Sequence, residues 1–126
     1  MEIETKVYPH LTAPFGAFCH AVRANGFLFI SGFTASGTPQ EHGDIVAQTE
    51  STMEQIKSIL EAEGAGFGDV VKVTVYVTEL DKLDEIHQVR FRYFGGHLPA
   101  STLVQVDALV QPHLKIEIET VAALRS

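Results

Sequence analysis

The sequence predicts a single α+β domain, and three observations lead to this fold class. The chain has 126 residues, the size of one ordinary domain. Hydrophobic residues make up 45% of it and charged residues 20%, so a core can form. Segments with an apolar residue at every second position alternate with segments whose apolar residues recur at steps of three and four. We therefore expect strands and helices to share one core over residues 1–126.

The first half of the chain predicts a hairpin followed by a helix. Two short apolar segments, Gly16–Val22 and Gly26–Gly32, indicate antiparallel strands. The turn lies at Asn25, because an Asn-Gly pair tolerates positive φ at both central positions. A loop rich in Gly, Pro, Ser and Thr covers residues 34–43, and residues 44–63 then carry an apolar stripe at helical spacing.

The second half predicts a strand, a helix and two closing strands. Residues 69–77 alternate, with the four valines from Val71 to Val77 on one face. The segment Thr78–Asp81 indicates a capping box at the start of the second helix. The closing strands are Leu103–Leu109 and Leu114–Ala122. The resulting order is ββαβαββ, with both helices on one sheet face. The other face must also be covered, and from this we infer oligomerisation.

Charge and cysteine content argue against several classes of function. The formal net charge of −7 argues against a nucleic-acid binder, which needs a basic face for phosphates, and against anionic membranes. Cys19 is the only cysteine, so no disulfide can form within the chain, which is compatible with a reducing compartment. The N-terminal residues are partly acidic and contain no apolar h-region, so we expect no secretory signal. No run approaches the roughly 20 apolar residues needed to span a bilayer. We expect a cytoplasmic protein with neither nucleic acid nor membrane as partner.

The histidines do not predict a metal site. No two of them stand four residues apart on a helix, and none accompanies a pair of cysteines. The six are His10, His20, His42, His87, His97 and His113. We therefore expect scattered histidines and no bound metal.

Charged residues in two places leave alternatives open. Glu117 and Glu119 project from the same face of the last predicted strand. Either this face is solvated, or a carboxylate lies desolvated in a cleft, with a raised pKa suited to general acid–base chemistry. Arg90 and Arg92 on the second helix are either solvated or bind an acidic group.

The C-terminal segment PASTLVQVDALVQPHLKIEIETVA resembles the signature of the RidA/YjgF family of enamine/imine deaminases. In that signature, Pro-Ala-Arg and a hydrophobic strand precede a strand that reads Glu-Ile-Glu, and Pro99–Ala100 and Lys115–Ala122 match it. The segment Phe29–Gly32 is similar to the family's Ser-Gly strand end, and Asp69–Val77 to its central strand. The likeness spans nearly the whole chain in the same order.

The resemblance implies a chorismate-mutase-like fold, in which two helices pack on one face of a six-stranded mixed sheet. It also implies a homotrimer with small-molecule sites in three clefts between subunits. Family members hydrolyse reactive enamines or imines to a carbonyl compound and ammonia, and they require no metal or organic cofactor.

The resemblance also assigns candidate site residues. Glu117 matches the family glutamate that positions or activates water, and Ser31 with Gly32 matches a pair that lines the cleft. Three further candidates depart from the family pattern. They are Phe18, where tyrosine is usual, Leu103, where cysteine is common, and His87, where asparagine is frequent.

The largest departure from the family is Ser101, which stands where the best-known members have an arginine forked onto the substrate carboxylate. A serine hydroxyl cannot supply that charged, bidentate contact. The role of the missing arginine is then taken by another residue, either Arg90, Arg92 or His87, or the substrate lacks the carboxylate. The expected function is a RidA-like enamine/imine deaminase with altered substrate specificity. The alternative is a trimeric ligand-binding or regulatory module without catalysis.

Overall fold

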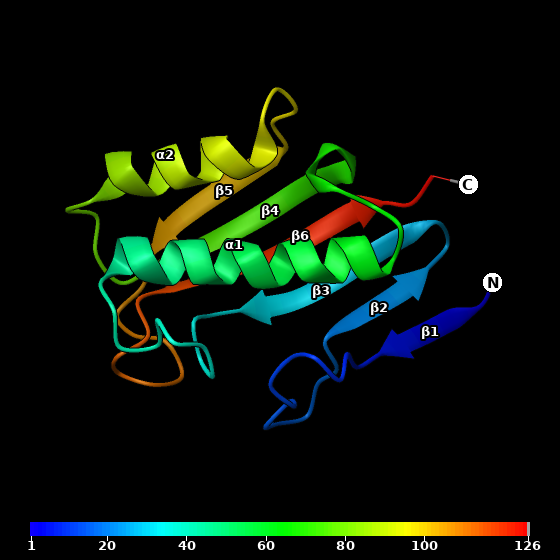
Figure 1. Cartoon of the computed structure of the whole chain (residues 1–126), viewed down its shortest axis with the longest axis horizontal. Helices are drawn as coiled ribbons and strands as arrows, with labels where there is room; N and C mark the ends of the chain where they lie inside the picture. Colours follow the sequence, from blue (N-terminus) through cyan, green and yellow to red (C-terminus); the bar gives the residue numbers. More distant parts are fainter. Residues whose placement is uncertain (126) are drawn as a thin grey trace.

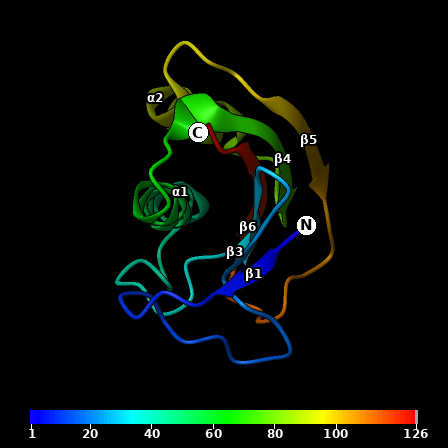
Figure 2. The same cartoon turned by 90° about the vertical axis from the view of Figure 1, so that its right-hand side faces the viewer.

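A six-stranded sheet carries both helices on one of its faces in the computed structural model, which describes residues 1–125 (Figures 1 and 2). The strands are β1 (Ile3–Lys6), β2 (Ala21–Ala24), β3 (Phe27–Phe33), β4 (Val70–Val77), β5 (Ala100–Gln105) and β6 (Ile116–Ala123). The helices are α1 (Ile45–Ala62) and α2 (Leu83–Phe94), and a short 3-10 helix covers Phe67–Asp69. The strand order is β1-β2-β3-β6-β4-β5, with β4 and β5 parallel and the other pairs antiparallel. The predicted α+β fold is confirmed.

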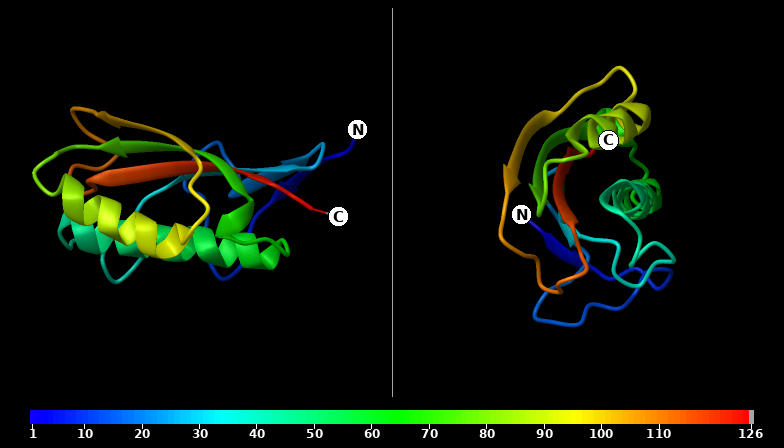
Figure 3. Two further views of the ribbon diagram at one scale, coloured as in Figure 1. Left: turned by 90° about the horizontal axis from the view of Figure 1, so that it is seen from above. Right: turned by 90° about the vertical axis from the view of Figure 1, so that its left-hand side faces the viewer.

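The core lies between the sheet and the helices (Figure 3). Alternate residues of the central strands point toward the helices, among them Leu28 of β3 and Ile118 of β6. Met53, Ile56 and Leu60 of α1 recur at helical spacing and are fully buried against them. Each such side chain contributes about 1.5–3 kcal/mol through the removal of apolar surface from water.

The turn and the first helix form as the sequence predicts. Asn25 and Gly26 have φ angles of 51° and 81°, which two-residue hairpin turns require. The Asp44 side chain accepts a hydrogen bond from the Ala47 N–H (2.9 Å) and caps α1. Gly64, with φ of 75°, follows the last helical turn.

The N-terminal strands differ from the prediction in two respects. The segment Gly16–Cys19 is a loop, so the strand predicted over Gly16–Val22 begins only at Ala21. An additional strand, β1, pairs with β2 through Ile3 opposite Ala24. The order of elements is therefore βββαβαββ. The sequence of β1, IETK, is too short and polar to show an apolar alternation, so its strand pairing with β2 is not evident from the sequence.

A β-bulge at the start of β4 makes the predicted orientation of Val71 wrong. The register against β6 shifts between Val70 and Lys72, so one extra residue is inserted. Val70 and Val73 are buried, whereas Val71 is 43% exposed and lies away from the core. The side-chain alternation predicted from Val71 onward therefore holds only from Val73.

Two boundaries in the second half also differ. The capping box predicted at Thr78–Asp81 is absent, because the Thr78 N–H still donates to Lys115 O in the sheet (3.0 Å), and α2 begins after Lys82. The fifth strand covers Ala100–Gln105 rather than Leu103–Leu109. Its polar first residues continue the parallel pairing with β4, which an apolar pattern does not reveal.

The sheet face opposite the helices has no covering layer among residues 1–125 (Figure 2). It carries exposed apolar side chains. Phe27 and Phe29 of β3 are 38% and 46% exposed there, and Val104 of β5 is 40% exposed. Neither helix of this part of the chain has the length and apolarity that crossing a membrane requires.

Candidate functional site

A pocket of about 460 Å³ lies between the loop that precedes β2 and the open face of the sheet. The loop contributes Pro14, Phe15 and Phe18, among others. The end of β3 and the start of β6 form the opposite wall. Four of the predicted site residues line this pocket. They are Phe18, Ser31, Gly32 and Glu117.

Gly32 allows the Glu117 side chain to lie directly on β3. A Cβ atom at position 32 would overlap Glu117 Oε2 and would lie 2.8 Å from its Cδ atom. The β3–β6 register shifts between Ile30 and Phe33, which contains this close approach. A glycine is therefore required wherever Glu117 occupies this position.

Of the two glutamates on this face, Glu117 is the desolvated one. Burial raises the pKa of the Glu117 carboxyl, and the charge of Glu119 raises it further. Glu119 is exposed, and its Oε1 accepts a hydrogen bond from Tyr76 Oη (3.0 Å). A carboxyl with a raised pKa in a pocket has the property that general acid–base chemistry needs.

His20 forms part of the pocket wall, although the sequence did not single it out. Its Nδ1 accepts a hydrogen bond from the Tyr8 N–H (2.9 Å). The tautomer that accepts at Nδ1 donates from Nε2, which lies 2.9 Å from Thr12 O. Both ring nitrogens are thus used within the fold, so His20 holds the loop rather than offering a proton to a ligand.

The polar and aromatic neighbours of Glu117 differ in how firmly they are held. Ser31 Oγ donates to Cys19 O (2.7 Å), and the Ser31 N–H donates to His20 O (3.0 Å), which fixes this residue at the pocket wall. Phe18 is 45% exposed and packs edge-on against Phe15, with ring centroids 5.7 Å apart. The two rings leave one side of the pocket apolar. Phe15 was not among the predicted site residues, and it directly precedes the segment Gly16–Val22 that was predicted to be a strand.

The other four predicted residues lie elsewhere. Within residues 1–125, His87, Arg90, Ser101 and Leu103 do not line the pocket. Ser101 and Leu103 stand opposite the buried Val73 and Val75 of β4, so they lie on the helix side of the sheet.

Glu117, by contrast, stands opposite Tyr76, which alternates with Val75 along β4 and therefore belongs to the other face. Glu117 and Ser101 thus point to opposite sides of the sheet within one subunit. The predicted residues therefore form two groups. One includes Glu117 and lines the pocket, and the other includes Ser101 and lies on the side of the sheet that α2 covers.

Arg90 of α2 lies beside the serine that replaces the family arginine. Its Nη2 donates a hydrogen bond to Ser101 Oγ (2.7 Å), and partial burial lowers the pKa of the guanidinium. Arg92 is directed elsewhere, since its Nη2 donates to Glu50 Oε1 of α1 (2.7 Å). His87 is three residues before Arg90 and shares its side of the helix. Of the two arginines, only Arg90 contacts Ser101.

The pocket offers carboxylates but no cluster of metal ligands. Among residues 1–125, one group brings three His, Cys, Asp or Glu ligand atoms together, and it consists of Glu41, His42 and His113. None of these three lines the pocket.

Comparison with known proteins places the chain in one family. The sequence model of the Endoribonuclease L-PSP family matches residues 10–124. A RutC family protein of Pyrococcus horikoshii is 39% identical over 112 residues, which cover 86% of this chain and 88% of that protein. The chloroplastic Reactive Intermediate Deaminase A of Arabidopsis thaliana is 34% identical over 117 residues, which cover 89% of this chain and 61% of that protein.

Solved structures agree with this assignment. The crystal structure of the yeast protein YEO7 has a TM-score of 0.90 and 29% identity, covering 98% of this chain and all of that one. A YjgF/YER057c/UK114 family member from Mycobacterium tuberculosis has a TM-score of 0.79 and 29% identity, again covering 98% of this chain and 100% of that one. The fold is accordingly of the chorismate-mutase-like type. The chain belongs to the Endoribonuclease L-PSP family, which is the RidA/YjgF family that its C-terminal segment resembles.

Proposed function

We propose that this protein is a RidA-like deaminase that hydrolyses an enamine or imine to a carbonyl compound and ammonia. The observation that carries the proposal is the desolvated Glu117 carboxyl held against Gly32 in the pocket. Water attacks the imine carbon while the Glu117 carboxylate accepts a proton from it. The proton then passes to the substrate nitrogen, which gives a carbinolamine. Its hydroxyl proton moves to the nitrogen as the C–N bond breaks, which releases ammonia and the carbonyl product. The reaction needs no metal or organic cofactor.

The site is proposed to be completed by a neighbouring subunit in a homotrimer. Support comes from the two groups of candidate residues, which lie on opposite faces of the sheet in one chain. The exposed Phe27 and Phe29 supply apolar surface for a subunit contact. In this arrangement, the Glu117 pocket of one subunit meets the Arg90–Ser101 pair of the next.

Substrate specificity is proposed to differ from that of arginine-bearing relatives. Ser101 has no charge, and the nearest guanidinium reaches it from α2 rather than from the strand. Arg90 keeps further N–H donors beyond the one bound to Ser101 Oγ, and these are available to an acidic group. An acidic substrate is therefore held by the Arg90–Ser101 pair, in a position displaced from that set by a strand arginine.

The test is the hydrolysis of 2-iminobutyrate generated in situ, compared with a relative that has arginine at this position. We expect slower hydrolysis by this protein, and equal rates would contradict the altered specificity. Glu117→Gln is expected to lower the rate by about 10²–10⁴-fold. Glu61→Gln is the matched control, because Glu61 is exposed on α1 and does not line the pocket. Full activity of Glu117→Gln would remove this residue from the mechanism.

A second candidate function is a trimeric ligand-binding or regulatory module without catalysis. It is favoured by Phe18 and Leu103, which supply neither the hydroxyl nor the thiol usual at these positions. Thermal-shift screening with small carbonyl and carboxylate metabolites, followed by turnover assays on the hits, separates the two functions. Ligands that bind and are never consumed favour the module.

A further inference from the structure

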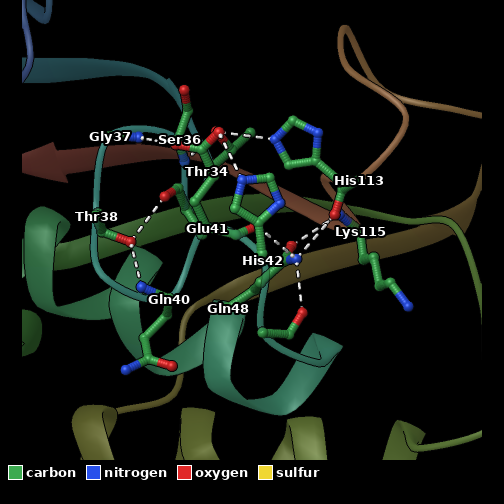
Figure 4. Close-up of polar contacts among 12 residues, drawn as sticks. Thr34, Ser36, Gly37, Thr38, Gln40, Glu41, His42, Gln48, His113 and Lys115 are labelled. Atoms are coloured by element: carbon green, nitrogen blue, oxygen red, sulfur yellow. Dashed lines mark hydrogen bonds and ion pairs between the residues drawn. The ribbon is translucent and has the colours of Figure 1, made fainter.

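Two histidines and a glutamate meet at the end of the molecule where the loops before α1 and β6 approach each other (Figure 4). Glu41 and His42 belong to the loop before α1, and His113 belongs to the loop before β6. The Nε2 atoms of His113 and His42 lie 2.8 Å and 3.8 Å from the same oxygen, Glu41 Oε2. The two imidazole rings stack, with centroids 4.4 Å apart.

These distances suit the coordination of one metal ion. Zinc binds imidazole nitrogen and carboxylate oxygen at about 2.0–2.2 Å in tetrahedral geometry, so two of its ligand atoms lie about 3.4 Å apart. The two measured separations from Glu41 Oε2 fall on either side of this value. All three ligand atoms lie within 4.8 Å of one another, so shifts of less than about 1.5 Å bring them into place.

A fully buried glutamine holds both loops in position. The Nε2 of Gln48 donates to His113 O (2.9 Å), to Gly43 O (3.0 Å) and to Glu41 O (3.2 Å). Its Oε1 accepts a hydrogen bond from the Lys115 N–H (2.8 Å). One side chain of α1 thereby fixes segments that are more than 60 residues apart in the sequence. Figure 4 shows this amide beneath the two rings.

The Glu41 carboxylate is itself oriented for ligation. Its Oε1 accepts a hydrogen bond from the Gly37 N–H (2.8 Å), which leaves Oε2 directed at the imidazoles. Hydrogen bonds of this kind orient carboxylates in metal sites. The side chain of His42 is 77% exposed, so an ion reaches the cluster directly from solvent.

We propose that Glu41, His42 and His113 bind a divalent late-transition-metal ion of the zinc class, with solvent at the remaining coordination position. Two imidazoles and a carboxylate favour zinc over magnesium or calcium, which prefer oxygen ligands. The ion links the loop before α1 to the loop before β6 and stabilises the folded chain, because it binds the folded state preferentially. The site is separate from the pocket, so it does not depend on the proposed deaminase activity.

A simple ion pair between His113 and Glu41 is the competing explanation. It accounts for the 2.8 Å contact but assigns no role to His42, which contributes a third ligand atom from an exposed position. The two explanations differ in what removal of His42 does: it removes one of three metal ligands but leaves the ion pair intact.

The experiment is titration calorimetry with zinc chloride on the untagged protein after treatment with EDTA and dialysis. We expect a single zinc ion per chain, and at least about tenfold weaker binding in His42→Ala and in His113→Ala. His97→Ala is the matched control, because His97 is exposed and lies outside the cluster. Zinc should also raise the melting temperature of the wild type and of the control variant.

Melting in EDTA checks the fold of each variant, and the exposed His42 is the one whose removal disturbs the fold least. Absence of zinc binding by the wild type would overturn the proposal. Unchanged zinc affinity in His42→Ala would also overturn it, since the ion pair alone would then explain the cluster.

Discussion

Replacement of Arg90 by methionine tests whether this arginine binds an acidic substrate or only lies on the surface of α2. Methionine keeps an unbranched apolar stem but removes the guanidinium that donates to Ser101 Oγ at 2.7 Å. The matched variant is Arg92→Met on the same helix, which loses its ion pair with Glu50 of α1. Both members of that pair are about half exposed or more, at 61% and 49%, so its loss costs at most about 1 kcal/mol of stability.

The expected effect follows from the strength of hydrogen bonds to charged groups. Such a bond contributes about 1.5–3 kcal/mol, and about 1.4 kcal/mol corresponds to a factor of ten. Loss of the Arg90 contact to a substrate carboxylate is therefore expected to lower kcat/KM by about 10–100-fold. Arg92→Met should keep the wild-type value.

The assay follows ammonia release from 2-iminobutyrate generated in situ, with the uncatalysed hydrolysis subtracted. A second substrate, an imine of similar size without the carboxylate, measures the chemistry alone. Arg90→Met should lose rate only toward the acidic substrate. An equal loss toward both imines, or the same loss in Arg92→Met, would refute the assignment of Arg90 as the anchor.

Three further predictions concern Glu117, its glycine neighbour and the core. Burial raises the pKa of Glu117 above its ordinary value of 4.5, and the carboxyl must be ionised to act as a base. The value of kcat/KM should therefore fall as the pH is lowered through that raised pKa. The pH profile of Glu117→Gln should not show this decrease. Gly32→Ala should displace the Glu117 carboxylate and lower kcat by about 100-fold in steady-state kinetics. Gly66→Ala is the control and should keep the wild-type kcat, because the space around its Cβ position is open. Leu28→Ala should lower the free energy of unfolding, measured by urea titration, by about 2–5 kcal/mol, because Leu28 is fully buried. Leu98→Ala, at an exposed position, should change this free energy by less than about 0.5 kcal/mol.

Sequence patterns predicted those elements whose side chains follow a regular period. Helix α1 and the hairpin turn at Asn25 carry strong local signals, an apolar stripe and an Asn-Gly pair, and both form as expected. The β4 bulge was missed because the extra residue, Val71, is itself a valine and preserves the appearance of alternation. Strand β1 was missed because its stability depends on a partner strand rather than on its own composition.

The candidate site was predicted in part for a related reason. The motif around Glu117 is contiguous in the sequence, and its proximity to Gly32 follows from the pairing of β6 with β3. The Arg90–Ser101 contact depends on how α2 packs over β5, which no local spacing encodes. The histidine cluster was not predicted for the same reason, because no local spacing brings His42 and His113 together and they meet only through tertiary structure.

The placement of Glu117 and Ser101 on opposite faces of one sheet has a genetic consequence. If each site takes these residues from two different subunits, a chain that is inactive alone can still contribute half of a working site. A chain with a defective Glu117 still offers an intact Arg90–Ser101 surface to its neighbour, and a chain with a defective Arg90 still offers an intact pocket. Two such alleles expressed in one cell then complement each other through mixed trimers, although neither supports activity alone.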